Sequence, residues 1–234
     1  MDRSQRQAAR VFAITTPLLY VVIMIAYRHF YGPFQVWRDD ATTARNFAAH
    51  EHLLHFYIAS AAVYGVGTII AMAALYVMFR TIGRGVALFA VFARLLYAVM
   101  WFIFLIDLFG ALRIMKGGTY LRAFEPDRQQ ALAGLQIASG WDAYYIGLTF
   151  YALGAVLFSY LFFKSRYVPR VLAVFGILSS LFEGLCGFAY LADRNFGAIV
   201  SVNWYEMPVF LFEVVICIWL LVRGLRPQGA NKMV

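Results

Sequence analysis

The chain has 234 residues, of which 63% are hydrophobic and 14% are charged. Soluble domains average about 25% charged residues, so the composition excludes an ordinary soluble domain. The formal net charge of +8 raises the question of nucleic acid, but the Arg residues lie mostly in polar stretches between apolar runs. That arrangement indicates membrane topology and contact with anionic lipid headgroups, so we expect membrane lipids as partners and no nucleic acid.

Six apolar runs are long enough to cross the hydrocarbon of a membrane, which takes about 20 helical residues. In chain order we expect these helices at residues 11–27, 51–78, 86–112, 141–163, 171–191 and 206–222. Together they occupy most of the chain and leave no room for a second domain. The sequence therefore predicts one all-α domain over residues 1–234, a polytopic membrane helix bundle whose first apolar run is retained and not cleaved as a signal peptide.

The polar stretches between these runs read as loops. Residues 28–49 contain the turn signal Gly32-Pro33, and residues 80–84 form a tight turn. The longest loop, residues 113–140, holds a segment at 127–138 that we expect to be a surface helix starting near Pro126.

The distribution of Lys and Arg predicts the orientation of the helices. Eleven of the 20 Lys and Arg residues lie in the N-terminus, the 80–84 turn, the 164–170 turn and the C-terminal tail, and Asp2 is the one acid among them. The other three loops carry eight Lys and Arg together with several acids. The positive-inside rule then places both termini in the cytoplasm.

The stretch from Asn46 to Tyr57 concentrates ionisable groups at the start of an apolar helix. It holds three of the four histidines, His50, His52 and His55, together with Glu51. Imidazole and carboxylate suit Zn, Fe, Mn or Cu, so these histidines could bind a divalent metal as a cofactor. The spacing is not that of the His-Glu-x-x-His zinc-peptidase motif, and interfacial histidines that bond headgroups, water or loop carbonyls are the alternative.

Several ionisable residues fall inside the predicted helices, where each costs roughly 2.5–3.5 kcal/mol on insertion scales. Arg94 lies near the middle of its helix, and Asp107 is about 140° around that helix, so we expect Arg94 to meet Glu213 or Glu183 from a neighbouring helix. Every acid within a helix lies in the predicted outer half. We therefore expect an outward-opening chamber lined by histidines and carboxylates.

The residues that we expect to line a ligand site share helix faces or ionisable character. They are Glu51, His55, Arg94, Tyr97, Trp101, Glu183, Phe210 and Glu213. One interpretation is a binding protein for a small amphipathic or lipid ligand. Another is a membrane-embedded enzyme that acts on a lipid or isoprenoid, with Glu51, Glu183 or Glu213 for acid–base chemistry or the histidines with a metal. The sequence decides neither activity nor substrate.

Sequence motifs in several helices resemble one bacterial multi-pass membrane family, domain of unknown function 4386. They include Tyr145-Ile-Gly-Leu-Thr-Phe-Tyr-Ala-Leu-Gly, the turn around Arg166-Tyr-Val-Pro-Arg170, Phe92-Ala-Arg94-Leu and Pro208-Val-Phe-Leu-Phe-Glu213. The chain departs from the family pattern at His50 and His55, where Asn and Arg are expected, and at Glu183. The resemblance implies six helices in the bacterial inner membrane and brings no activity.

Overall fold

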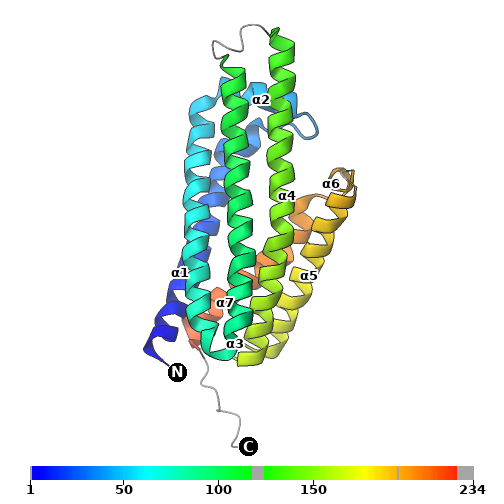
Figure 1. The fold of residues 1–234 in the computed structure, drawn as a ribbon. Helices are drawn as coiled ribbons and strands as arrows, with labels where there is room; N and C mark the ends of the chain where they lie inside the picture. The colour runs from blue at the N-terminus through cyan, green and yellow to red at the C-terminus, as the bar shows by residue number, and fades with distance from the viewer. Residues whose placement is uncertain (1, 118–123, 194, 226–234) are drawn as a thin grey trace, which may run out of the picture. The chain divides into compact units, whose positions relative to one another are not determined.

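The computed structural model describes residues 2–117, 124–193 and 195–225. In chain order its elements are α1 (Arg3–Ala26), η1 (Tyr27–Tyr31), η2 (Gly32–Phe34), α2 (Asp40–Ala49), α3 (Glu51–Met115), α4 (Pro126–Ser165), α5 (Arg170–Ala192), α6 (Phe196–Ile199) and α7 (Val202–Arg223) (Figure 1). These described residues contain no strand, so the predicted all-α class is confirmed.

Five helices among the described residues are long and apolar enough to cross a membrane. They are the N-terminal run Arg3–Phe34 and the helices α3, α4, α5 and α7. Helix α3 has 65 residues, far more than the roughly 20 that one crossing needs, and its backbone leaves the helical conformation at Gly83. Gly83 lies in the predicted 80–84 turn, and each arm of α3 is by itself long enough for a crossing.

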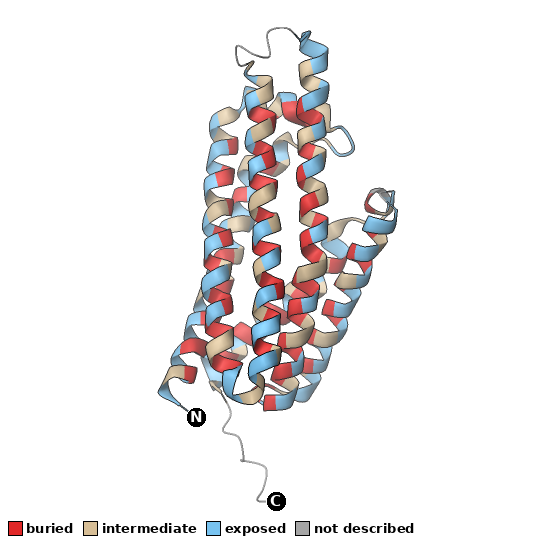
Figure 2. Cartoon of the chain, in the orientation of Figure 1, coloured by how far each residue is buried: buried red, intermediate tan, exposed pale blue. Residues whose placement is uncertain are grey.

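The exposed surface of the helices is also apolar. Buried residues follow one side of each long helix and exposed residues the other (Figure 2). On α5 the exposed side includes Leu178, Leu185 and Phe188, which are 60%, 69% and 62% exposed. An apolar surface of this extent suits contact with lipid and not with water. The chain is a multi-pass membrane protein.

The helices form two compact units, which are described separately. Unit 1 comprises Met1–Leu19, Gly67–Ala98 and Ile146–Val234, and unit 2 comprises Tyr20–Val66 and Val99–Tyr145. Helices α3 and α4 contribute residues to both units.

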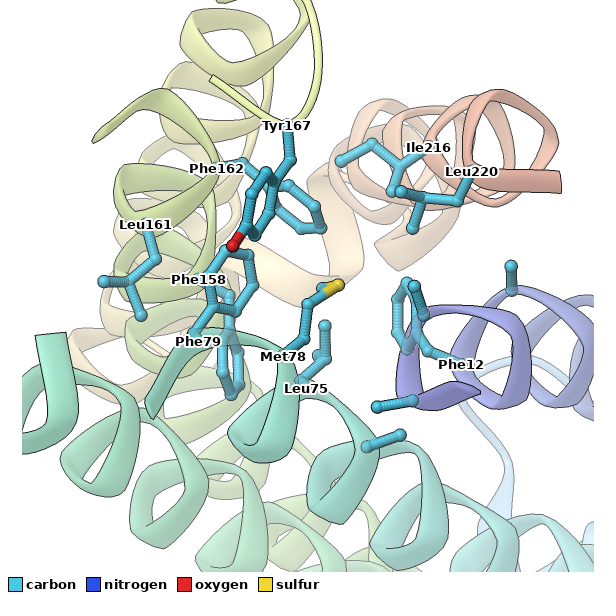
Figure 3. Packing of buried hydrophobic residues seen from close by; sticks show 14 of the residues in the cluster. Phe12, Leu75, Met78, Phe79, Phe158, Leu161, Phe162, Tyr167, Ile216 and Leu220 are labelled. Atoms are coloured by element: carbon cyan, nitrogen blue, oxygen red, sulfur yellow. The ribbon is translucent and has the colours of Figure 1, made fainter. Parts of the chain in front are cut away.

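The core of unit 1 is apolar and rich in aromatic rings (Figure 3). The ring of Phe79 on α3 packs edge-on to Phe162 of α4 at 4.7 Å and stacks with Tyr167 at 6.0 Å. Gln5 of α1 is buried beside them, and its amide donates to the carbonyl of Met78 at 3.2 Å, to Thr81 Oγ1 at 2.7 Å and to the Tyr167 hydroxyl at 3.4 Å. One side chain thus joins the start of α1 to the Gly83 bend and to the turn between α4 and α5.

The core of unit 2 is centred on the fully buried ring of Tyr31. This ring lies 4.7 Å from that of Tyr57 and 4.9 Å from that of Phe47, which brings η1, α2 and α3 together. The two arms of α3 also meet here, because Trp101 Nε1 donates to the carbonyl of Ala61 at 2.8 Å. Aromatic pairs at such distances add stabilisation beyond the area that they bury.

Two predicted boundaries are wrong. Helix α1 starts at Arg3 and not at residue 11, because Gln5, Ala8 and Ala9 are buried within unit 1 and both residue types form helices readily. Helix α4 runs unbroken from Pro126 to Ser165, so the predicted surface helix at 127–138 and the helix from 141 are one element. Gly140, the last residue of the predicted 113–140 loop, lies inside α4 and lets it approach α3: a Cβ there would lie 3.2 Å from Phe104 and Asp107 side-chain atoms.

The predicted loop at 28–49 contains an additional helix, α2. Asp39 is its N-cap, and Oδ1 of Asp39 accepts from the backbone N–H of Thr42 at 2.8 Å. The Thr42 hydroxyl donates to Oδ2 at 2.6 Å, and these two bonds hold the pKa of Asp39 below its ordinary value. The Asp-capped start was visible in the sequence, but the segment lacks the apolar run that marks a membrane helix. The predicted start of the next helix at Glu51 is confirmed.

The packing of α5 against α7 predicts a specific glycine requirement. A Cβ at Gly176 would lie 2.1 Å from Cζ of the buried Phe212 ring, whereas a Cβ at Gly85 would meet no atom within 4 Å. We expect Gly176→Ala to lower the free energy of unfolding by about 1–3 kcal/mol through overpacking. Gly85→Ala, the matched control, should leave it unchanged or slightly higher. Unfolding of both variants in detergent checks this, and equal stabilities would contradict the described contact between α5 and α7.

Candidate functional site

A buried ion pair lies inside unit 1. Nη1 of Arg94, on α3, is 3.3 Å from Oε1 of Glu213, on α7, and the two side chains are 6% and 10% exposed. A guanidinium stays protonated in proteins, so its burial requires a compensating negative charge. The expectation that Arg94 pairs with a carboxylate from a neighbouring helix is confirmed, and Glu213 is that partner.

Tyr151 of α4 contacts both members of the pair. Its hydroxyl donates to Oε1 of Glu213 at 2.8 Å, and Cζ of Arg94 lies 3.5 Å from the centre of its ring. The predicted site residue Tyr97 packs edge-on against the same ring at 4.9 Å. One aromatic side chain therefore supplies a hydrogen bond to the carboxylate and a cation–π contact to the guanidinium.

Gly154 makes the space for Arg94. A Cβ at this position of α4 would lie 2.5 Å from Cγ of Arg94 and 3.0 Å from the carbonyl oxygen of Ala90. Only a residue without a side chain lets α4 pass so close to the α3 backbone and to the arginine stem. Glycine at 154 and tyrosine at 151 are one helical turn apart, so a single face of α4 holds the guanidinium.

A cavity of about 20 Å³ adjoins the ion pair. Its polar lining consists of Arg94, Glu213 and Ser159, and its apolar lining comes from Phe12, Leu75, Ala155, Phe158, Phe162, Phe212 and Ile216. Such a volume has room for about one water molecule. Ser159 is fully buried, and its hydroxyl has no hydrogen-bond partner among the described residues. The lining thus combines both charges of the pair with a hydroxyl that has no hydrogen-bond partner among the described residues.

Glu183 of α5 is the second deeply buried carboxylate of unit 1. It is 2% exposed, and its Oε2 has no hydrogen-bond partner among the residues that the structure describes. The charged groups that act on it electrostatically are Glu206, Arg94 and Glu213. We call Arg94, Tyr151, Ser159, Glu183 and Glu213 the polar centre of unit 1.

The other predicted ligand residues lie elsewhere or play other parts. In unit 2, Glu51 at the start of α3 pairs with Lys116 at 2.5 Å, His55 packs beside the ring of Phe109, and Trp101 bonds the opposite arm of α3. Phe210 of α7, in unit 1, is half-buried one turn before Glu213.

The predicted metal ligands His50, His52 and His55 lie at and just after the start of α3. Among the described residues, no group of three or more His, Cys, Asp or Glu side chains could hold a metal ion. His50 is the residue before α3, so its ring turns away from the helix: it stacks on Phe34 at 4.3 Å, and Nδ1 lies 3.0 Å from the carbonyl oxygen of Asn46. His50 thus lies before the helix, whereas His52 and His55 are three residues apart within α3.

The ion pair predicts an asymmetric response to substitution. Glu213→Met leaves a buried guanidinium without its counter-charge and should lower the free energy of unfolding by about 3–5 kcal/mol. The double variant Arg94→Met with Glu213→Met removes both charges and should regain most of that loss. Unfolding of the two variants and wild type in detergent checks this. A single variant as stable as the double one would show that Arg94 does not depend on Glu213.

Comparison with known proteins identifies the family and no activity. No curated protein and no solved structure matches the chain. The model of one family, described as Domain of unknown function (DUF4386), matches residues 15–224, which include all of the polar centre. The chain belongs to this family of unknown function.

Proposed function

We propose that this protein binds a small amphipathic ligand in the membrane, with the polar group of the ligand at the polar centre of unit 1. The observation that carries the proposal is the cavity beside the Arg94–Glu213 pair. Its lining combines two opposite charges, a Ser159 hydroxyl without a partner among the described residues, and several phenylalanine side chains. Charged groups within membrane helices are costly, and those that persist generally serve a ligand or ion site. A lining of this mixed kind is suited to an amphipathic molecule.

The size of the cavity limits which part of the ligand enters it. About 20 Å³ accommodates a hydroxyl or a similar small head but no hydrocarbon tail. The tail would lie along the exposed apolar surface of the helices, which faces lipid. The proposed ligand is therefore small at its polar end and soluble in the membrane, as a lipid or an isoprenoid derivative is.

We further propose that the chain crosses the bacterial inner membrane six times, with α3 crossing twice about Gly83 and both termini in the cytoplasm. Gln5 ties α1 to the Gly83 bend and to the α4–α5 turn, and Leu220 near the end of α7 belongs to the same core cluster. One end of unit 1 therefore gathers nine exposed Lys and Arg side chains: Arg3, Arg6, Arg10, Arg80, Arg84, Lys164, Arg166, Arg170 and Arg223. Such a surface favours the cytoplasmic side.

Cysteine labelling tests the topology. The native Cys186 and Cys217 are both buried, which keeps the background low. Arg84→Cys places a thiol at the basic end of unit 1, and Asn203→Cys places one at the start of α7, about one helix length away. We expect a membrane-impermeant maleimide to label Asn203→Cys in intact cells and Arg84→Cys only after lysis. The reverse pattern would invert the topology.

Ligand content tests the binding function. Protein extracted from its membrane should carry a lipid-soluble compound that mass spectrometry finds at near-stoichiometric amounts, since unit 1 provides a defined polar site. The double variant Arg94→Met with Glu213→Met, expected to fold, should lose it, whereas Gly85→Ala should retain it. Equal content in all three proteins would show that the compound binds elsewhere, and its absence from wild type would count against the proposal.

A further inference from the structure

The basic end of unit 1 carries positive charge that the chain itself does not balance. Nine exposed Lys and Arg side chains gather there, and none of them forms an ion pair within the part of the chain that the structure describes. Asp2 is the one acid described at this end, and its carboxylate also accepts a hydrogen bond from Ser4. At the start of α3, by contrast, Lys116 pairs with Glu51. The basic end therefore attracts anions from outside the chain.

The turn between α4 and α5 fixes the position of two of these charges. Tyr167 and Val168 are buried in the core cluster (Figure 3), and the Tyr167 hydroxyl accepts from the amide of Gln5. Arg166 and Arg170 flank this buried pair in the sequence and are both exposed. Arg166 has a φ of 56°, in the left-handed region that favours glycine. The turn thus keeps an arginine where glycine would cost the backbone less, which favours a role for the arginine's charge.

Apolar side chains hold two of the arginines at the edge of the lipid-facing surface. Cζ of Arg170 lies 5.4 Å from the centre of the Phe163 ring. Cζ of Arg223, at the end of α7, lies 5.9 Å from the centre of the Trp219 ring. Val171, which follows Arg170, is 83% exposed. A cation and an exposed apolar side chain therefore lie next to each other, as a molecule with a charged head and an apolar tail requires.

We infer that the basic end of unit 1 binds the phosphate headgroups of anionic phospholipids, with Arg166, Arg170 and Arg223 among the side chains that contact them. The inference does not depend on the ligand of the polar centre. Arginine matches phosphate because its planar guanidinium donates two parallel N–H bonds. A phospholipid fits both parts of the surface, since its phosphate meets the arginines and its acyl chains meet exposed residues such as Val171. A soluble phosphate fits the charge alone.

Lipid selectivity tests the inference. The full chain is reconstituted in discs of phosphatidylcholine and phosphatidylglycerol and extracted in mild detergent, and mass spectrometry measures the lipids that it retains. We expect wild type to retain phosphatidylglycerol in preference to phosphatidylcholine. The triple variant Arg166→Gln with Arg170→Gln and Arg223→Gln should lower this preference about a hundredfold, because each basic residue near an anionic membrane contributes roughly fivefold. High salt should lower the preference of wild type as well.

The matched control is Arg28→Gln with Arg38→Gln and Arg45→Gln. It removes three exposed arginines from unit 2, where Asp39 interacts electrostatically with Arg45, and should keep the wild-type preference. Arg166→Gly, which suits the left-handed backbone, should fold as well as wild type and still lower the preference about fivefold.

Two results would overturn the inference. One is a wild-type preference in the triple variant, or an equal loss in the control. The other is displacement of the retained lipid by an equal concentration of soluble glycerol phosphate, which would show that the surface recognises a phosphate without its acyl chains. Either result would leave the ligand of the polar centre untouched, because none of the substituted arginines belongs to that site.

Discussion

The packing of unit 1 depends on the charge of Arg94. A guanidinium cannot shed its proton in a protein interior, so the helices around it must supply a counter-charge and room for its stem. Helix α7 supplies the carboxylate of Glu213, and α4 supplies the ring of Tyr151. Gly154 of α4 leaves room for the Arg94 stem because it has no side chain. Three helices are thus held in one register by a single charge.

An ion pair of this kind is a weak argument for stability alone. Well-packed apolar residues often stabilise a core as much as a buried pair does, and the surrounding cluster of Phe12, Phe158 and Phe212 shows that the chain can build such a core. Ser159 and Glu183 add two further buried polar groups with unpartnered atoms among the described residues, which only increases the cost. The sum of these costs is the physical ground for proposing a ligand at the polar centre.

The sequence predicted features that follow from the chemistry of one residue. It did not predict features that depend on how two helices pack against each other. A charge in mid-helix demands a partner, so the pairing of Arg94 could be predicted from its position and from the spacing of Glu213. A glycine such as Gly140 can end a helix or allow a neighbouring helix to pack closely. The sequence does not distinguish these two roles, and the position of α3 does. The hydrogen bond from the Tyr151 hydroxyl to Glu213 and the lack of a partner for the Ser159 hydroxyl among the described residues likewise depend on where α4 lies.

The charges of unit 1 are separated along its helices. Arg170 begins α5 at the basic end, and Glu183 lies 13 residues later, about 20 Å along the axis. Glu206, near the start of the antiparallel α7, is at the same far end as the carboxylate of Glu183. The basic end attracts anionic groups and the carboxylates at the far end repel them, because an apolar medium screens charge weakly. An anionic lipid headgroup would therefore be held at the basic end of unit 1.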